Sequence, residues 1–323
     1  MQFDWRRGFA TALAVAAAIV TAGSSAQAQV VPGSGYQITT VGDTFEDEEW
    51  EYIPNWPKAS QNLDSQQRHP TGESNNGRWY ESGYRGQPDV VRRVKTPRGG
   101  LPGSKGALLL QTKFSGIPEM ITRKQQQDDF LANVNGVVGS IPVTYTPSVV
   151  TRVYLPPFDQ WENRTGATFG FRADVEGIME KEEKRRTLFG TRIKKVKKED
   201  AYWPGFFIQF NSKTDPKYDR DSAIVLIRSD EKGQDLFGPF ISEPGWWTFG
   251  MSFTPDGKVH YYASPGVDRL TQADYLTSNY PYGAKAKKFV TFFYNVVNMD
   301  DGRTWSTKWI VDDPKVFVMR KYW

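Results

Sequence analysis

The side chains best suited to ligand chemistry in this sequence are aromatic rings set beside small polar groups. They occur in "EPGWWTFGMSFTPDGKVHYYASPG", residues 243–266, which contains Trp246, His260 and Tyr262. A sugar ring has an apolar C–H face that stacks on aromatic rings and hydroxyl groups that hydrogen-bond to polar side chains. The segment therefore predicts a carbohydrate site. His260 and Tyr262, with Arg172, are also candidates for proton transfer.

The pairing of this segment follows from its turn. A three-residue loop at Pro255-Asp256-Gly257 pairs Phe253 with Val259 and Met251 with Tyr261. Directly paired residues share one face of a sheet, so these apolar side chains face the core. The opposite face then holds Trp246, Thr248, Gly250, Ser252, His260 and Tyr262.

Similar polar side chains alternate out of two other segments, "ATFGFRADVE" and "FFIQFN". These side chains are Arg172, Asp174, Gln209 and Asn211. We expect them to share one concave face with the polar face of the 243–266 hairpin and to bind a polysaccharide there. For any one of them alone, an ordinary outward-facing polar residue is the alternative, because surface is plentiful and pockets are few.

An irregular stretch over residues 68–93 is expected to fold over the rim of this groove. It contains "RHPTGESNNGRWYESGYRGQPDVV", in which turn-forming residues predominate. Such long irregular segments are uncommon inside a compact domain and are often functional. The residues that it would bring to the groove are Trp79, Tyr80, Tyr84 and Arg85.

Short runs rich in β-branched and aromatic residues recur between turn signals from Gly106 onward, among them "GALLLQTK", "SVVTRVYL", "SAIVLIRS" and "FVTFFYNVV". They predict an all-β fold, a two-sheet antiparallel β-sandwich of jelly-roll type with long loops. Short helices are expected only at "RKQQQDDFLANV" and "RLTQADYL".

One block interrupts this pattern, "GIMEKEEKRRTLFGTRIKKVKKEDAYW", residues 177–203. It predicts a charged hairpin inserted into the domain. A solvated insertion is one interpretation, and contact with an anionic polymer is the other. The lysines that would make this contact are Lys194, Lys195, Lys197 and Lys198.

The first 28 residues have the pattern of a secretory signal peptide, with Arg6 and Arg7 before an apolar run and a cleavage site near Ala28. The apolar run is about 14 residues long, and a membrane span needs about 20. We therefore expect a secreted, periplasmic or cell-envelope protein without a membrane span once mature. A flexible leader over 29–42 and one jelly-roll domain over 43–323 would follow. General and twin-arginine export both remain open.

Composition excludes several functional classes. The 323 residues include no cysteine, which rules out disulfides and thiolate chemistry. The net charge of +4 is too small to indicate a nucleic-acid partner. No phosphate loop, dinucleotide motif or serine-hydrolase elbow is present.

The only cofactor that the sequence suggests is a structural Ca²⁺ ion. Carboxylates on adjacent opening and closing strands would suit this hard cation. The candidates are Asp43, Glu46, Asp312 and Asp313, with Asp300 and Asp301 as weaker ones. Capped acidic turns or surface salt bridges are the alternative.

Several motifs together resemble the concanavalin A-like lectin/glucanase jelly rolls, including laminin-G-like modules, in a secreted bacterial branch. They are the opening "GDTFEDEEWEY", the closing "WSTKWIVDDPKVFV", and "TFGFRADVEG", "WPGFFIQF" and the 243–266 hairpin between them. The resemblance spans residues 43–320 and implies the fold. The paired-glutamate strand of the glucanases is absent, and "KVHYY" matches only part of the alginate-lyase pattern.

Three functions follow, in this order. The first is a non-catalytic carbohydrate-binding protein, the second a structural cell-envelope protein, and the third a polysaccharide lyase or glycoside hydrolase that uses His260, Tyr262 and Arg172.

Overall fold

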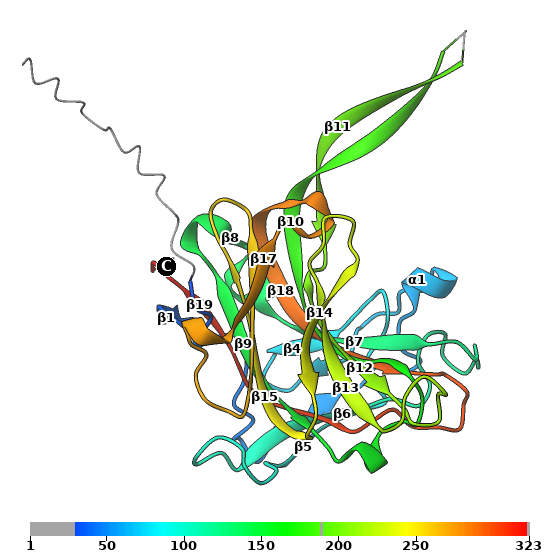
Figure 1. The fold of residues 1–323 in the computed structure, drawn as a ribbon, viewed down its shortest axis with the longest axis vertical. Coiled ribbons are helices and arrows are strands. Elements are labelled where there is room, and N and C mark those ends of the chain that lie inside the picture. Colours follow the sequence, from blue (N-terminus) through cyan, green and yellow to red (C-terminus); the bar gives the residue numbers. More distant parts are fainter. Residues whose placement is uncertain (1–29, 188–189, 322–323) are drawn as a thin grey trace, which may run out of the picture.

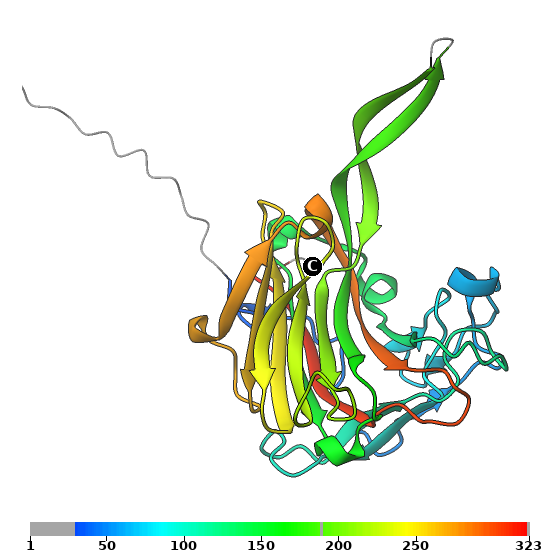
Figure 2. The ribbon, with the colours of Figure 1, turned by 45° about the vertical axis from the view of Figure 1, so that its right-hand side comes forward.

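The computed structural model describes residues 30–187 and 190–321, and these form two antiparallel sheets packed face to face (Figure 1, Figure 2). We call them sheet A and sheet B. Sheet A has eight strands: in spatial order β17 (Tyr275–Asn279), β16 (Val259–Pro265), β15 (Gly245–Phe253), β9 (Ser148–Leu155), β19 (Trp309–Val318), β6 (Gly106–Gln111) and β5 (Val90–Lys95), with β1 (Tyr36–Gln37) paired to β19.

Sheet B has eleven strands: β14 (Asp235–Ile241), β13 (Ser222–Arg228), β12 (Gly205–Asn211), β10 (Gly166–Thr187), β18 (Lys285–Asn298), β7 (Gln126–Ala132), β4 (Trp79–Glu81), β3 (Glu73–Ser74) and β2 (Tyr52–Ile53), with β11 (Gly190–Tyr202) paired to β10 and β8 (Ile141–Pro142) paired to β18. The predicted all-β, two-sheet jelly-roll fold is therefore confirmed. The strand runs expected from Gly106 onward are present, and two further runs near the C-terminus, "KWIVDD" and "KVFVMRK", join as the single strand β19.

Aromatic side chains from both sheets fill the space between them. Phe206 of sheet B lies 5.3 Å from Phe249 and 5.5 Å from Tyr261 of sheet A, measured between ring centroids. Phe169 and Trp309 make a similar contact across the sandwich at 4.8 Å. Buried aromatic surface of this size stabilises a core without disulfides.

Helices in the described ranges are short: α1 (Gln61–Asp64), α2 (Val134–Val138), η1 (Val143–Tyr145), η2 (Phe158–Gln160), η3 (Gln272–Asp274) and η4 (Pro281–Gly283). The helix expected at "RKQQQDDFLANV" is wrong, because residues 126–132 form β7. The one expected at "RLTQADYL" is a single 3₁₀ turn followed by β17. No described helix is long and apolar enough to cross a membrane.

The register predicted for the 243–266 hairpin is confirmed. Phe253 pairs with Val259, Met251 with Tyr261 and Gly250 with Tyr262. Its apolar face lies in the core, as expected.

The outer face of this hairpin is covered by residues 30–34. The Ser252 hydroxyl donates to the Val30 carbonyl at 2.7 Å, and a Cβ atom on Gly250 would lie 2.7 Å from Pro32. Further along, β1 pairs with β19. Residues 30–42 are thus part of the fold, and the expected separate leader is wrong for them.

The block at 177–203 forms a long hairpin of β10 and β11 that extends away from the sandwich (Figure 1, Figure 2). We call its outer part, residues 178–199, the arm. The expectation of a protruding insertion is confirmed, although residues 188–189 at its tip lie outside the described residues.

Candidate functional site: a cleft on sheet B

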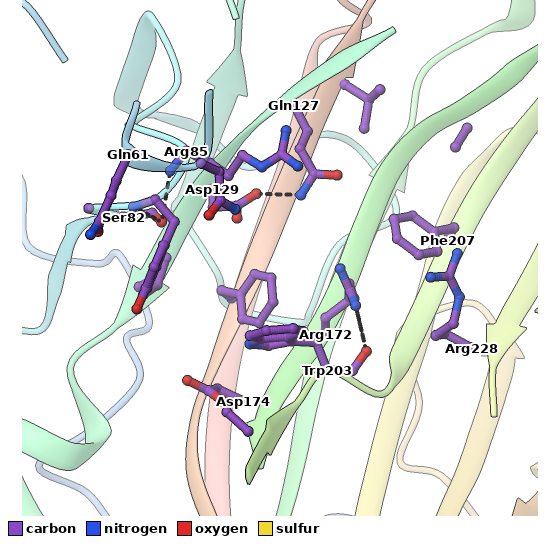
Figure 3. A pocket seen from close by; sticks show the side chains of 18 of the residues that line it. Gln61, Ser82, Arg85, Gln127, Asp129, Arg172, Asp174, Trp203, Phe207 and Arg228 are labelled. Atoms are coloured by element: carbon purple, nitrogen blue, oxygen red, sulfur yellow. Dashed lines mark hydrogen bonds between the residues drawn. The ribbon is translucent and has the colours of Figure 1, made fainter. Parts of the chain in front are cut away.

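A cleft of about 960 Å³ lies on the outer face of sheet B. Strands β7, β18, β10, β12 and β13 form its floor. Segments 61–67 and 80–85 form one wall, and residues 200–203 close another side. The close-up in Figure 3 shows Arg172 and Asp174 on the floor, with Ser82 and Arg85 on the wall segment.

Strand periodicity places the floor residues. On β10, Phe171 and Ala173 face the core, so Arg172 and Asp174 face the cleft. On β12, Phe206 and Ile208 face the core, while Phe207 and Gln209 face the cleft. The same alternation on β7 directs Gln127, Asp129 and Leu131 into the cleft.

Two arginines flank a phenylalanine ring on the floor. The guanidinium carbons of Arg172 and Arg228 both lie 5.2 Å from the ring centroid of Phe207. Arg172 also donates to the Trp203 carbonyl at 2.6 Å, and Arg228 forms two hydrogen bonds to Asp235 at 2.5 and 3.0 Å. Both guanidinium groups are therefore held in fixed orientations, and both contact the ring of Phe207.

A second polar cluster surrounds Asp129. Its Oδ1 accepts hydrogen bonds from Asn295 at 2.6 Å and from Gln127 at 2.9 Å. Burial raises the pKa of Asp129 above its ordinary value, and the amide donors partly offset this. The amide of Gln127 is thereby fixed at the surface of the cleft, as Figure 3 shows.

Asp174 is the least satisfied carboxyl group of the cleft. Its Oδ1 is buried and has no hydrogen-bond partner among the described residues. Burial, and then the charge of Glu176, raise its pKa to about 6 against the opposing effect of Arg172. Burial and the nearby Asp174 also raise the pKa of Tyr80 to about 12. A carboxyl group with a pKa near 6 can take up or release a proton at neutral pH.

The cleft brings together several residues that the sequence analysis singled out: Arg172, Asp174, Gln209, Tyr80, Tyr84 and Arg85. The segment around residues 80–85 does lie at the rim, as expected. Asn211 is beside them but does not line the cleft, and its side chain accepts a hydrogen bond from Gln209 at 3.0 Å.

The expectation that Trp246, His260 and Tyr262 share this face is wrong. They belong to β15 and β16 of sheet A, on the far side of the core from Arg172. All three are buried: Tyr262 packs with Val150 and Leu270, beneath the cover formed by residues 30–34. Whether any of them binds a ligand stays a prediction, but they do not line the cleft.

The catalytic set of His260, Tyr262 and Arg172 is consequently not assembled. His260 Nε2 lies 2.8 Å from the hydroxyl of Thr254, and burial lowers its pKa below the ordinary value. A buried histidine with this local partner has a structural environment.

Trp79 is also not at the rim. It is fully buried and stacks on Phe130 with 5.0 Å between ring centroids. Within the strand 79–81, alternation sends Trp79 inward and Tyr80 toward the cleft.

The four carboxylates expected to bind Ca²⁺ each have a hydrogen-bond or ion-pair partner within the protein. Asp43 accepts a hydrogen bond from the Trp50 indole at 3.0 Å, and Asp313 forms an ion pair with Arg152 at 2.9 Å. Glu46 accepts a hydrogen bond from the backbone N–H of Lys105, and Asp312 accepts one from the hydroxyl group of Ser104. The described residues contain no group of three or more side chains suited to hold a metal ion. Of the weaker candidates, Asp300 accepts a hydrogen bond from the backbone N–H of Thr122, and Asp301 accepts one from the backbone N–H of Arg303 in its own loop.

Several cleft residues were missed from the sequence: Gln127, Asp129, Trp203, Phe207 and Arg228. Gln127 and Asp129 were hidden because their segment was interpreted as a helix. Its alternation of Gln127, Asp129 and Leu131 with Asp128, Phe130 and Ala132 was the signal that would have identified a strand.

The arm lysines Lys194, Lys195, Lys197 and Lys198 are exposed, as expected for a charged hairpin. Two of them face acidic residues on the opposite strand. Lys198 lies 2.6 Å from Glu183 and Lys195 lies 3.9 Å from Glu180. Part of the positive charge is therefore balanced within the arm.

No family model and no curated protein matches this chain. Among solved structures it is similar to a PL7 alginate lyase from Zobellia galactanivorans, with a TM-score of 0.34, 9% identity, and coverage of 86% of this chain and 96% of that one. It is also similar to the Emp46p carbohydrate recognition domain in its potassium-bound form, with a TM-score of 0.35, 10% identity, and coverage of 72% of this chain and 88% of that one.

A third similar structure is an alginate lyase from Pseudomonas aeruginosa, with a TM-score of 0.35, 9% identity, and coverage of 72% and 87%. Scores and identities this low carry no argument about activity.

Proposed function

We propose that the cleft on sheet B binds a carbohydrate chain and that the protein is a carbohydrate-binding jelly roll without catalytic activity. The observation that supports this most is the combination of exposed aromatic rings with fixed polar groups in one cleft. The rings are Tyr84 and Trp203, and the fixed groups are Arg172, Gln127 and Arg228.

Preorganisation is the physical reason for favouring recognition. A guanidinium or amide group already held by the protein loses little rotamer entropy when it binds a hydroxyl group. Each stacked ring contributes about 0.5–1.5 kcal/mol beyond its buried area. A few such contacts give dissociation constants in the micromolar to millimolar range.

A second candidate is favoured by Asp174. Its raised pKa and unpartnered oxygen suit a general acid or base, and Arg172 lies beside it to stabilise negative charge. This would make the protein a polysaccharide lyase or glycoside hydrolase. A structural cell-envelope protein, which would bind no sugar, is the third possibility.

A glycan array combined with turnover assays separates these candidates. Trp203 and Trp305 are equally exposed, at 42% and 43%, but only Trp203 lines the cleft. Trp203→Ala should weaken sugar binding about fivefold or more, as loss of about 1 kcal/mol requires. Trp305→Ala is the matched control and should bind like the wild type.

The outcomes are distinct. If both variants retain full sugar binding, the cleft is not the binding site. If the wild type binds no glycan on the array, the structural protein is favoured. Release of shortened or unsaturated sugars, abolished in Asp174→Asn, would favour the enzyme.

Export is part of the proposal. The signal peptide at 1–28 lies outside the described residues. Val30 already hydrogen-bonds to Ser252, so cleavage near Ala28 would leave the cover of sheet A in place. We propose that the mature protein acts in the periplasm, in the cell envelope or outside the cell.

A further inference from the structure

Two phenylalanine side chains are exposed on β14, next to the cleft. Phe237 is 81% exposed and Phe240 is 51% exposed. Most large apolar side chains of this protein are in the core, and adjacent exposed aromatic rings on one strand commonly mark a binding surface.

Strand pairing places both rings on the same face as the cleft floor. Phe237 pairs with Leu226, and Asp235 pairs with Arg228. Leu226, Asp235 and Arg228 all line the cleft. Because directly paired residues point to one side of a sheet, Phe237 continues the floor outward. Phe240 pairs with Ile224 and lies on the same face, one step further along the strand.

The edge of β14 is poorly suited to pairing with another strand. The register shifts between Ile224 and Leu226, which marks a bulge in the strand pair, and Pro239 lacks a backbone N–H group. Natural edge strands use such features to prevent sheet extension. The side-chain face, more than the backbone edge, is therefore available to a partner.

The position of the rings also suits a long ligand. Phe207 is on β12 and Phe237 is on β14, so two strand spacings of about 4.8 Å, roughly 10 Å in all, separate their strands. Leu226 lies between the two rings on β13. The Arg228–Asp235 pair, two residues further along these strands, offers hydrogen-bonding groups to a chain that crosses them.

We propose that Phe237 and Phe240 form an outer subsite of the cleft, where they stack on further sugar rings of the same polysaccharide. This inference rests on the proposed function and deepens it. The ligand is then an extended polysaccharide, because a mono- or disaccharide held in the cleft would not reach the outer rings.

The test compares ligand lengths. Titration calorimetry would use cello-oligosaccharides as a neutral series and oligogalacturonates as an acidic series, each with two and eight sugars. In the series that binds, the wild type should prefer eight sugars by about tenfold or more, the effect of two further stacked rings. Phe237→Ala combined with Phe240→Ala should reduce this preference to about twofold or threefold, with affinity for two sugars unchanged.

Leu236→Ala is the control. Leu236 is on the same strand and is 37% exposed, but it pairs with Ile227, which faces the core. This variant should keep the full length preference. Melting curves should show that all variants are folded, because the deleted rings are exposed.

Three results would overturn the subsite. A length preference that survives in the double variant would exclude the rings from sugar binding. A wild-type dimer in sedimentation that the double variant loses, with sugar binding unchanged, would assign them to self-association. Failure of the wild type to bind any of the probes would remove the proposed function and the subsite with it, whereas binding without length preference would remove the subsite alone.

Discussion

At the scale of the residue, Asp174 links the stability of the fold to the chemistry of the cleft. Its pKa rises from 3.8 to about 6 because burial disfavours the carboxylate. A raised pKa in the folded state stabilises the protein fully below about pH 4, and this contribution is lost as pH rises through 6. The folded protein therefore carries an unfavourable charge at neutral pH.

Asp174→Asn should remove this pH dependence. We expect the variant to gain about 1 kcal/mol over the wild type at pH 7.5, since solvent at the cleft reduces the full effect of a two-unit shift. The melting temperature would rise by about 2–4 °C at pH 7.5 and little at pH 4. Thermal melts at the two pH values measure it, and an equal difference at both would contradict the assignment.

Tyr262 tests the corrected position of the 243–266 hairpin. The sequence analysis placed it in an open groove, where its loss would weaken binding and leave stability nearly unchanged. In the structure it is fully buried against Val150 and Leu270. Tyr262→Ala should therefore lower the free energy of unfolding by about 3–5 kcal/mol, as truncation of a buried aromatic does.

Denaturant unfolding measures this change, and binding to the array glycans should be retained below the unfolding transition. Leu236→Ala, on an exposed edge, serves as the comparison and should cost little. A Tyr262→Ala protein of normal stability with lost sugar binding would restore the original interpretation.

At the scale of the element, turns and alternation were sufficient to predict most strands. The loop at residues 255–257 fixed the register of β15 and β16, so the residues on each face were predicted individually. The same alternation placed Arg172 and Asp174 opposite the core side chains of β10. Both inferences depend only on neighbours that are close in sequence.

What local patterns do not determine is which sheet an element joins and what covers it. β10 and β15 have similar alternation, yet they lie in different sheets because of long-range pairings that the sequence does not specify. The polar face of β15 was taken as open, but residues 30–34 cover it. In β7, the run of Gln and Asp residues concealed a strand whose polar side forms part of the cleft floor.

At the scale of the whole molecule, positive charge is concentrated in the arm. Residues 181–196 contain seven basic and two acidic side chains, an excess of five, against a net charge of +4 for the entire chain. The remainder of the chain is therefore slightly acidic. The arm extends this charge away from the sandwich (Figure 2).

Part of that charge is not balanced by ion pairs within the described part of the arm. Lys195 and Lys198 have acidic partners across the arm, whereas Lys194 and Lys197 have no ion pair among the described residues. An exposed charge pair at 4 Å is worth roughly 1 kcal/mol in water. Two unpaired lysines would thus strengthen binding to a polyanion by roughly thirtyfold at low salt.

The corresponding variant replaces Lys194, Lys195, Lys197 and Lys198 with Gln. It should lose this affinity for dextran sulfate and elute from a dextran sulfate column at lower salt, because exposed charges bind a polyanion in a salt-dependent way. Its melting temperature should change little, since exposed ion pairs contribute at most about 1 kcal/mol each. Sugar binding in the cleft should be unaffected, because none of the four lysines lines it.

A control with the same change in net charge separates the arm from a general electrostatic effect. Four exposed lysines on the sandwich, Lys213, Lys217, Lys232 and Lys308, would be replaced with Gln. Earlier elution of the arm variant alone would assign polyanion binding to the arm. Equal shifts in both variants would show that only net charge matters, and no shift in either would leave the arm as a solvated insertion.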